Sequence, residues 1–230
     1  GTKFYNTQPP VEDATTVERL RSAGALMVGK TNMHEIGMGV TGLNTHYGTT
    51  RNPHHLDHYP GGSSSGSAAA VAAGLSPIAL GMDGGGSIRI PASLCGVVGL
   101  KTTWGRISSA GAAPLSWSIS TLGPITSTAN DAALAYSFLA GPDPKQLLTQ
   151  NQPPVELRDF GDANLTGVKL GKFSAWFNHA SADIVKNCER MLDAFISQGA
   201  TVEEIEIPEL NEAHMAHIVT IVTEMLTSLQ

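Results

Sequence analysis

Short apolar runs alternate with helical patterns along the first 142 residues. Residues 25–29, 78–82 and 97–100 are mostly apolar and bounded by turn residues, which predicts buried strands. Residues 15–23, 65–73, 88–94 and 130–139 have the composition and spacing of helices. Thr15 and Glu18 form a capping box for the first, and Gly24, Gly74 and Gly141 stand where three of them should end. This alternation predicts an α/β fold in which helices cover a sheet.

The second part of the chain follows a polar connection. Residues 143–166 are rich in Pro, Gln, Asp and Asn, and strands are then expected at 168–173 and 201–207, with helices at 183–198 and from 210 to the end. A domain boundary and an excursion within one sheet both fit the connection. We take residues 1–230 as part of a single domain, with its core motifs in 12–142 and a continuation in 167–230. Cys188 belongs to an apolar stripe of the helix 183–198 and is expected in the core.

Composition narrows the class of protein. Of 230 residues, 41% are hydrophobic and 15% are charged, with a net charge of −6, so clustered basic residues for nucleic acid are lacking. The two cysteines, Cys95 and Cys188, form no CxxC pair, which predicts reduced, buried thiols in an intracellular protein. There is no run of 18 apolar residues, so no membrane span is predicted. Because the chain starts without Met and stops inside a helical pattern, we expect it to be a fragment.

Two glycine-serine segments carry the candidate chemistry, PGGSSSGS at 60–67 and GGGS at 84–87. A phosphate cradle would need a following lysine, and a flexible linker would lack the strong flanking apolar runs. A nucleophile fits better, because three glycines leave room for a substrate and can aim successive N–H groups at one oxygen. We therefore expect Ser87 to attack a carbonyl, with oxyanion donors on Gly84, Gly85, Gly86 and Ser87. Asp83 and Arg89 are expected to brace this loop.

A serine nucleophile also needs a general base to take its proton, and the sequence does not show one clearly. None of the eight histidines lies in a recognisable Ser-His-Asp context, and no GxSxG motif occurs. His54, His55 and His58 could suggest a metal site, but they lie in an irregular loop without a rigid frame. We expect solvated histidines there, no metal and no cofactor.

Long ordered motifs resemble the amidase signature family. They are LRSAGALMVGKTNMHE at 20–35, GGSSSGSAAAVAAGL at 61–75, DGGGSIRIP at 83–91 and CGVVGLK at 95–101. The resemblance is strong over about residues 12–142 and continues weakly to the end. It implies a mixed central sheet with helices on both faces, which this fragment would contain incompletely.

The resemblance also implies a Ser-Ser-Lys triad with an acyl-enzyme intermediate. In that family the nucleophile corresponds to Ser87, and the proton relay, which follows a cis peptide bond, corresponds to Ser63. Ser64 is expected to hydrogen-bond within the same network. The lysine usually stands in a Lys-Asp motif upstream of the relay serine, but only Lys3 and Lys30 precede Ser63 here. The catalytic lysine is therefore expected before Gly1, and these residues alone should be inactive.

Within the family the motifs resemble most the plant-type fatty acid amide hydrolases, which cleave N-acylethanolamines. This implies a lipid amide as substrate, with Met38 lining its channel, and leaves open a homodimer and attachment to endomembranes through regions outside the chain. Three alternatives remain. They are an amidase for indoleacetamide or short-chain amides, the glutamine amidase subunit of a tRNA amidotransferase, and an inactive homologue that only binds.

Overall fold

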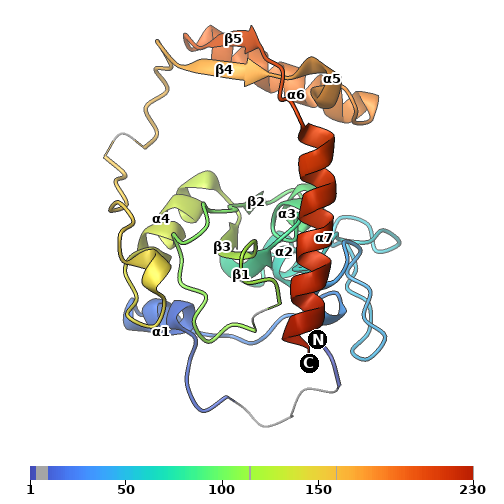
Figure 1. The fold of residues 1–230 in the computed structure, drawn as a ribbon, viewed down its shortest axis with the longest axis vertical. Coiled ribbons are helices and arrows are strands. Elements are labelled where there is room, and N and C mark those ends of the chain that lie inside the picture. The colour runs from blue at the N-terminus through green and yellow to red at the C-terminus, as the bar shows by residue number, and fades with distance from the viewer. Residues whose placement is uncertain (4–9, 114, 159, 230) are drawn as a thin grey trace. The chain divides into compact units, whose positions relative to one another are not determined.

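A computed structural model describes residues 1–3, 10–113, 115–158 and 160–229 (Figure 1). The chain divides into two compact units, the first Gly1–Val155 with Val219–Gln230 and the second Glu156–Ile218. The boundary at 155–156 falls inside the connection predicted for 143–166. The organisation of the whole chain as one domain stays a prediction.

The first unit is built on a three-stranded antiparallel sheet in the order β1 (Ile78–Asp83), β3 (Thr121–Thr126), β2 (Val98–Gly99). The register pairs Ala79 with Ile125 and Met82 with Leu122. All six residues of β3 are buried, as expected of a central strand. This strand was not predicted from the sequence, because Pro124 within it cannot donate a backbone hydrogen bond and argues against a central strand.

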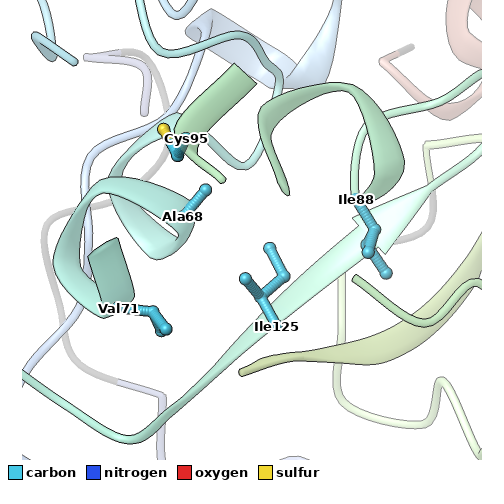
Figure 2. Close-up of a cluster of buried hydrophobic side chains, with 5 residues drawn as sticks. All are labelled: Ala68, Val71, Ile88, Cys95 and Ile125. Carbon is cyan, nitrogen blue, oxygen red and sulfur yellow. The ribbon is translucent and has the colours of Figure 1, made fainter. Parts of the chain in front are cut away.

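One face of this sheet packs on α2 (Ser65–Ala72) and α3 (Arg89–Cys95). Five buried side chains form a hydrophobic cluster there, and Figure 2 draws all five as sticks. Ile125 projects into this cluster from β3, and its register partner Ala79 packs against the same group. Cys95 is buried, as predicted, and burial raises the pKa of its thiol to about 11. The cluster consists of Ala68, Val71, Ile88, Cys95 and Ile125.

The opposite face packs on α1 (Thr15–Ser22) and α4 (Ala129–Leu139). Leu122 of β3 joins Leu20 and Leu139 in a second buried cluster, with Leu80 and Met82 of β1 against it. Because successive strand residues point to opposite faces, Ala79 and Leu80 serve different clusters. Helices on both sides of the sheet confirm the predicted fold class (Figure 1).

Three predicted helix C-termini are correct, and the predicted N-terminal capping box is wrong. Gly24, Gly74 and Gly141 have φ values of 87°, 70° and 121°, and each follows a helix as predicted. The capping box is wrong, because the N-cap of α1 is Ala14, without a side-chain cap. Thr15 instead donates a 2.7 Å hydrogen bond to the buried Asp143 carboxylate.

The strand predicted at 25–29 does not form. Leu26 and Val28 are 89% and 81% exposed, and no strand in the described part of the chain pairs with this segment. An apolar run predicts burial only where another strand is present to cover it.

Two short 3-10 helices also occur in the first unit, η1 (Glu35–Gly37) and η2 (Leu147–Thr149).

The second unit pairs β4 (Lys169–Lys172) with β5 (Thr201–Glu204) in parallel. The connection between them holds α5 (Ser174–Phe177) and α6 (Ala182–Ser197), since parallel strands need a crossover. The prediction that Cys188 is buried is wrong. Cys188 is exposed, and Ile184 and Met191 on the same stripe of α6 are 55% and 56% exposed, because this small unit does not cover that face of the helix.

The last helix, α7 (Leu210–Ser228), starts in the second unit, and its residues from Val219 onward belong to the first. It confirms the helix predicted from residue 210; residue 230 lies outside the described residues. Among the described helices, none combines the length and apolar character needed to cross a membrane.

Candidate active site

Ser87 lies in a short turn between β1 and α3. The strand ends at Asp83, the helix begins at Arg89, and the glycines 84–86 make the turn. Gly86 has a φ of 121°, and a Cβ there would approach Ile90 Cδ1 to 2.6 Å. Only glycine fits such a position without strain, so the turn presents Ser87 half-buried at the start of α3.

Asp83 holds this turn from inside. Its carboxylate is fully buried and accepts hydrogen bonds from the backbone N–H groups of Gly86 at 2.7 Å and Ile88 at 3.1 Å. Arg89 donates to both carboxylate oxygens, from Nε and Nη2, each at 3.0 Å. Burial raises the pKa of Asp83, but these hydrogen bonds lower it more, so the net pKa lies below its ordinary value. The bracing role predicted for Asp83 and Arg89 matches this geometry.

The second serine segment enters α2. The peptide bond between Gly62 and Ser63 is cis, as the family resemblance implies. The Ser63 carbonyl accepts a 3.0 Å hydrogen bond from the His34 amide. A Cβ on Gly62 would lie 2.9 Å from the backbone N of Gly42, so the segment is closely packed by a neighbouring loop.

Ser64 joins the two serine segments. Its backbone N–H donates to the Ser87 carbonyl at 3.2 Å, and its Oγ accepts from the Met82 amide at 3.3 Å. The residue is buried, so water does not compete for these contacts. They fix the start of α2 against the end of β1, and they involve backbone groups of Ser87 and Met82. The role predicted for Ser64 in the hydroxyl network stays a prediction.

Ser63 and Ser87 line one cavity of about 360 Å³. Ser64, Gly84 and Gly85 line it as well, so the two segments chosen from the sequence meet at one place. Within the described residues, no direct hydrogen bond joins the two hydroxyl groups of Ser63 and Ser87. Catalytic hydrogen bonds are often long in proteins without substrate, so the shared cavity is the relevant observation.

Gly86 drops out of the four predicted oxyanion donors. Its N–H already donates to Asp83, so the structure does not support Gly86 as a donor to substrate. The amides of the other three, Gly84, Gly85 and Ser87, have no acceptor within the part of the chain that the structure describes. Two or more N–H groups aimed at one point are what a tetrahedral oxyanion needs.

The apolar wall of the cavity was not found from the sequence. Met33, Leu115, Ile221 and Met225 line it. Met38, the predicted channel residue, is 48% exposed and does not belong to this lining. Ile221 and Met225 lie far along the chain on α7, and a helical apolar pattern alone does not tell a cavity wall from ordinary core.

Lys30 lines this cavity together with both serines, and among the described residues no other lysine does. Lys30 is exposed. From the sequence, the catalytic lysine was expected before Gly1, and Lys30 was not a candidate site residue.

A second, larger hollow of about 650 Å³ lies between α1 and the end of α4. Arg19 within it donates to the carbonyls of Leu139, Gly141 and Pro142 at 2.6, 3.2 and 2.7 Å. These bonds terminate α4 and occupy the guanidinium group. None of the predicted site residues lines this hollow, so we assign it a structural role.

Comparison with known proteins shows the family of this chain. Residues 1–229 match the family described as Amidase. A fatty acid amide hydrolase of Oryza sativa subsp. indica is 47% identical over 236 residues, covering 100% of this chain and 39% of the relative. The chain thus spans about two fifths of that relative.

Solved structures give the same result. A glutamyl-tRNA(Gln) amidotransferase subunit of Thermotoga maritima superimposes with a TM-score of 0.92 at 36% identity, over 97% of this chain and 50% of that one. Peptide amidase of Stenotrophomonas maltophilia gives 0.85 at 35% identity, over 95% and 46%. Because the family match extends over residues 1–229, the chain belongs to the amidase family.

Proposed function

We propose that the protein hydrolyses carboxylic amides with Ser87 as nucleophile and Ser63 as proton relay. The observation that carries this proposal is the single cavity lined by both serines and by Gly85. Membership of the amidase family supports the reaction class. Because the chain spans about half or less of its relatives, the activity is proposed for the complete protein.

The proposed reaction starts with proton transfer. As Ser87 Oγ bonds to the amide carbon, its proton passes to Ser63 Oγ, and the Ser63 proton passes to a neutral lysine. The carbonyl electron pair moves onto oxygen, where the amides of Gly84, Gly85 and Ser87 can donate; each donor that is used stabilises the transition state by about 3–4 kcal/mol. The C–N bond then breaks as Ser63 protonates the leaving amine and takes back the proton held by the lysine. Water then attacks the acyl-enzyme, and its proton passes through the same relay to Ser87 as the acid leaves.

The lysine in this scheme must be neutral, and burial is what favours the neutral form of an amine. Lys30 is exposed, so we assign the role to a lysine upstream of Gly1. Replacing Lys30 by alanine in the complete protein should then change turnover by no more than about threefold. Steady-state kinetics check this. A loss of about a hundredfold or more, the scale of a missing general base, would assign the role to Lys30 instead.

We propose a fatty acid amide as substrate. Support comes from the name of the rice relative and from the apolar wall formed by Met33, Leu115, Ile221 and Met225. An apolar wall favours an acyl chain, since burying each CH₂ contributes about 0.8 kcal/mol. A homodimer, membrane association and an intracellular location stay predictions.

The second candidate is the glutamine-hydrolysing subunit of a tRNA amidotransferase, favoured by the TM-score of 0.92 with the Thermotoga maritima protein. Release of ethanolamine from a long-chain N-acylethanolamine and hydrolysis of glutamine, measured on the complete protein, separate the two. We expect kcat/KM to favour the lipid amide by about a hundredfold or more. Equal or higher activity on glutamine would reject the lipid assignment, and turnover of neither would favour the inactive homologue.

A further inference from the structure

Glu224 of α7 holds a neighbouring loop with both of its carboxylate oxygens. Oε2 accepts from Ser116 Oγ at 2.7 Å and from the Ser118 amide at 3.2 Å. Oε1 accepts from Ser118 Oγ. Burial raises the pKa of Glu224, but the serine donors lower it more, so the net pKa lies below its ordinary value and the carboxylate is ionised at neutral pH.

The same loop is bound to α7 a second time. Ser228 Oγ donates to the Leu115 carbonyl at 2.9 Å. Glu224 and Ser228 are four residues apart, so they lie one turn apart on one face of the helix. The Ser116 carbonyl also accepts from the Ser120 amide at 2.9 Å. We call Leu115–Ser120 the latched segment.

The latched segment and this face of α7 together form one wall of the cavity at Ser87. Leu115, Ser116 and Ser120 line it from the segment, and Ile221 and Met225 line it from the helix. Because Ile221, Met225 and Ser228 recur at helical spacing, the latch and the wall share a face.

This wall contacts the glycine turn directly. A Cβ on Gly84 would approach Ser120 Oγ to 2.8 Å and Ile221 Cδ1 to 3.0 Å. The wall therefore packs closely against Gly84, at the start of the turn that carries Ser87. A shift of the latched segment would change the width of the cavity next to that serine.

We propose that Glu224 is a positioning residue that fixes the apolar wall of this cavity and thereby sets its preference for long apolar groups. Glu224 does not touch the reacting atoms. It keeps Leu115 and Ser120 against α7, so that a long chain meets a formed wall. This inference rests on the proposed function, because it takes the cavity at Ser87 as the substrate site.

The test uses two alkyl fluorophosphonates on the complete protein, one with a dodecyl and one with an ethyl chain. Both react at a nucleophilic serine, whose oxygen bonds to phosphorus as fluoride leaves. We measure the second-order labelling rate at Ser87 for each and take the long-to-short ratio. Glu224→Ala should lower this ratio about tenfold, the effect of losing one hydrogen bond to a charged group, mainly by slowing the dodecyl probe.

Two further variants distinguish a loss of the Glu224 contact from a general loss of folding. In Glu224→Gln the amide oxygen can still accept from the Ser118 amide and the serine hydroxyls can reverse, so the ratio should stay within about threefold of wild type. Ser118→Ala should lower the ratio partly. It should add little further loss in a Glu224→Ala background, because both changes break the same contact. If Glu224→Ala does not fold, Ser118→Ala decides the matter in the same way.

Glu204 is the matched control. It accepts from the Ser174 amide at 2.7 Å and Ser174 Oγ at 2.6 Å, a similar arrangement in the second unit. Glu204→Ala should leave the ratio unchanged. An unchanged ratio in Glu224→Ala, or equal losses in the two alanine variants, would overturn the inference while labelled Ser87 leaves the proposed function intact. A wild-type protein that is not labelled at Ser87 would instead overturn the proposed function.

Discussion

Replacing Ser87 by alanine in the complete protein should lower kcat for amide hydrolysis by about 10⁶-fold, the scale seen when a serine hydrolase loses its nucleophile. The hydroxyl is the group that would bond to the amide carbon, and we propose that the backbone amides of Ser87 and its neighbouring glycines in the cavity wall stabilise the resulting oxyanion. Alanine keeps the backbone, so those amides remain. The residual rate should come from binding and from these donors. Steady-state kinetics on the preferred amide give the result.

Ser93→Ala is the matched control for this substitution. Ser93 is exposed on α3, the helix that Ser87 precedes, and does not line the cavity. Its activity should equal wild type, and both variants should melt at the same temperature as wild type. Turnover by Ser87→Ala within about tenfold of wild type would remove Ser87 from the mechanism.

The second large effect is expected at Asp83. Asp83→Ala should lower the free energy of unfolding by about 3–5 kcal/mol, because it leaves buried donors and one arginine without their partner. Asp83→Asn should not rescue it, since the amide NH₂ would face N–H donors of Gly86, Ile88 or Arg89. Both variants should also lose activity, because the turn that carries Ser87 loses its brace. Urea denaturation of the complete protein measures the change in stability.

Asp13→Asn is the control for Asp83. Asp13 makes a 3.0 Å ion pair with Arg21 on the surface, where the two side chains are 39% and 58% exposed. An exposed pair contributes about 0–1 kcal/mol, so this variant should be nearly as stable as wild type. Equal stability losses at Asp83 and Asp13 would contradict the bracing role of Asp83.

The stability that Asp83 contributes should also depend on pH. Its pKa in the folded protein lies below the ordinary value of 3.8, so the ionised form stabilises the fold above that pH. The contribution is lost as the pH falls through the folded pKa. The advantage of wild type over Asp83→Asn should thus be constant near neutral pH and shrink below about pH 4. An advantage that grows on acidification would contradict this sign.

Local patterns predicted the elements whose burial depends on nearby residues. The helices 65–73 and 130–139 and the strand 78–82 form within one residue or so of their expected bounds. The strand predicted at 25–29 does not form, because nothing in the described chain covers this segment. The predicted burial of Cys188 was wrong, because an apolar stripe on a helix does not show which other element, if any, packs against it. The central strand β3 was missed because Pro124 is unusual in such a place.

The candidate active site also contains parts that could be predicted from local sequence and parts that could not. Both serine segments, the brace of Asp83 by Arg89 and the start of α3 could be predicted, since short motifs with glycine at fixed positions determine local geometry. The wall formed by Ile221 and Met225 could not, because it depends on how α7 meets a loop about a hundred residues earlier. Gly86 was assigned as a donor because the sequence does not reveal that Asp83 takes its N–H.

The most direct test of the proposed mechanism is the site of covalent modification in the complete wild-type protein. A fluorophosphonate probe, followed by peptide mass spectrometry, identifies the serine that attacks it. We predict one adduct on Ser87. We predict none on Ser63, Ser64 or Ser65, the three buried serines of the neighbouring segment. An adduct on a different residue, formed with Ser87 unmodified, would contradict the central claim that Ser87 is the nucleophile.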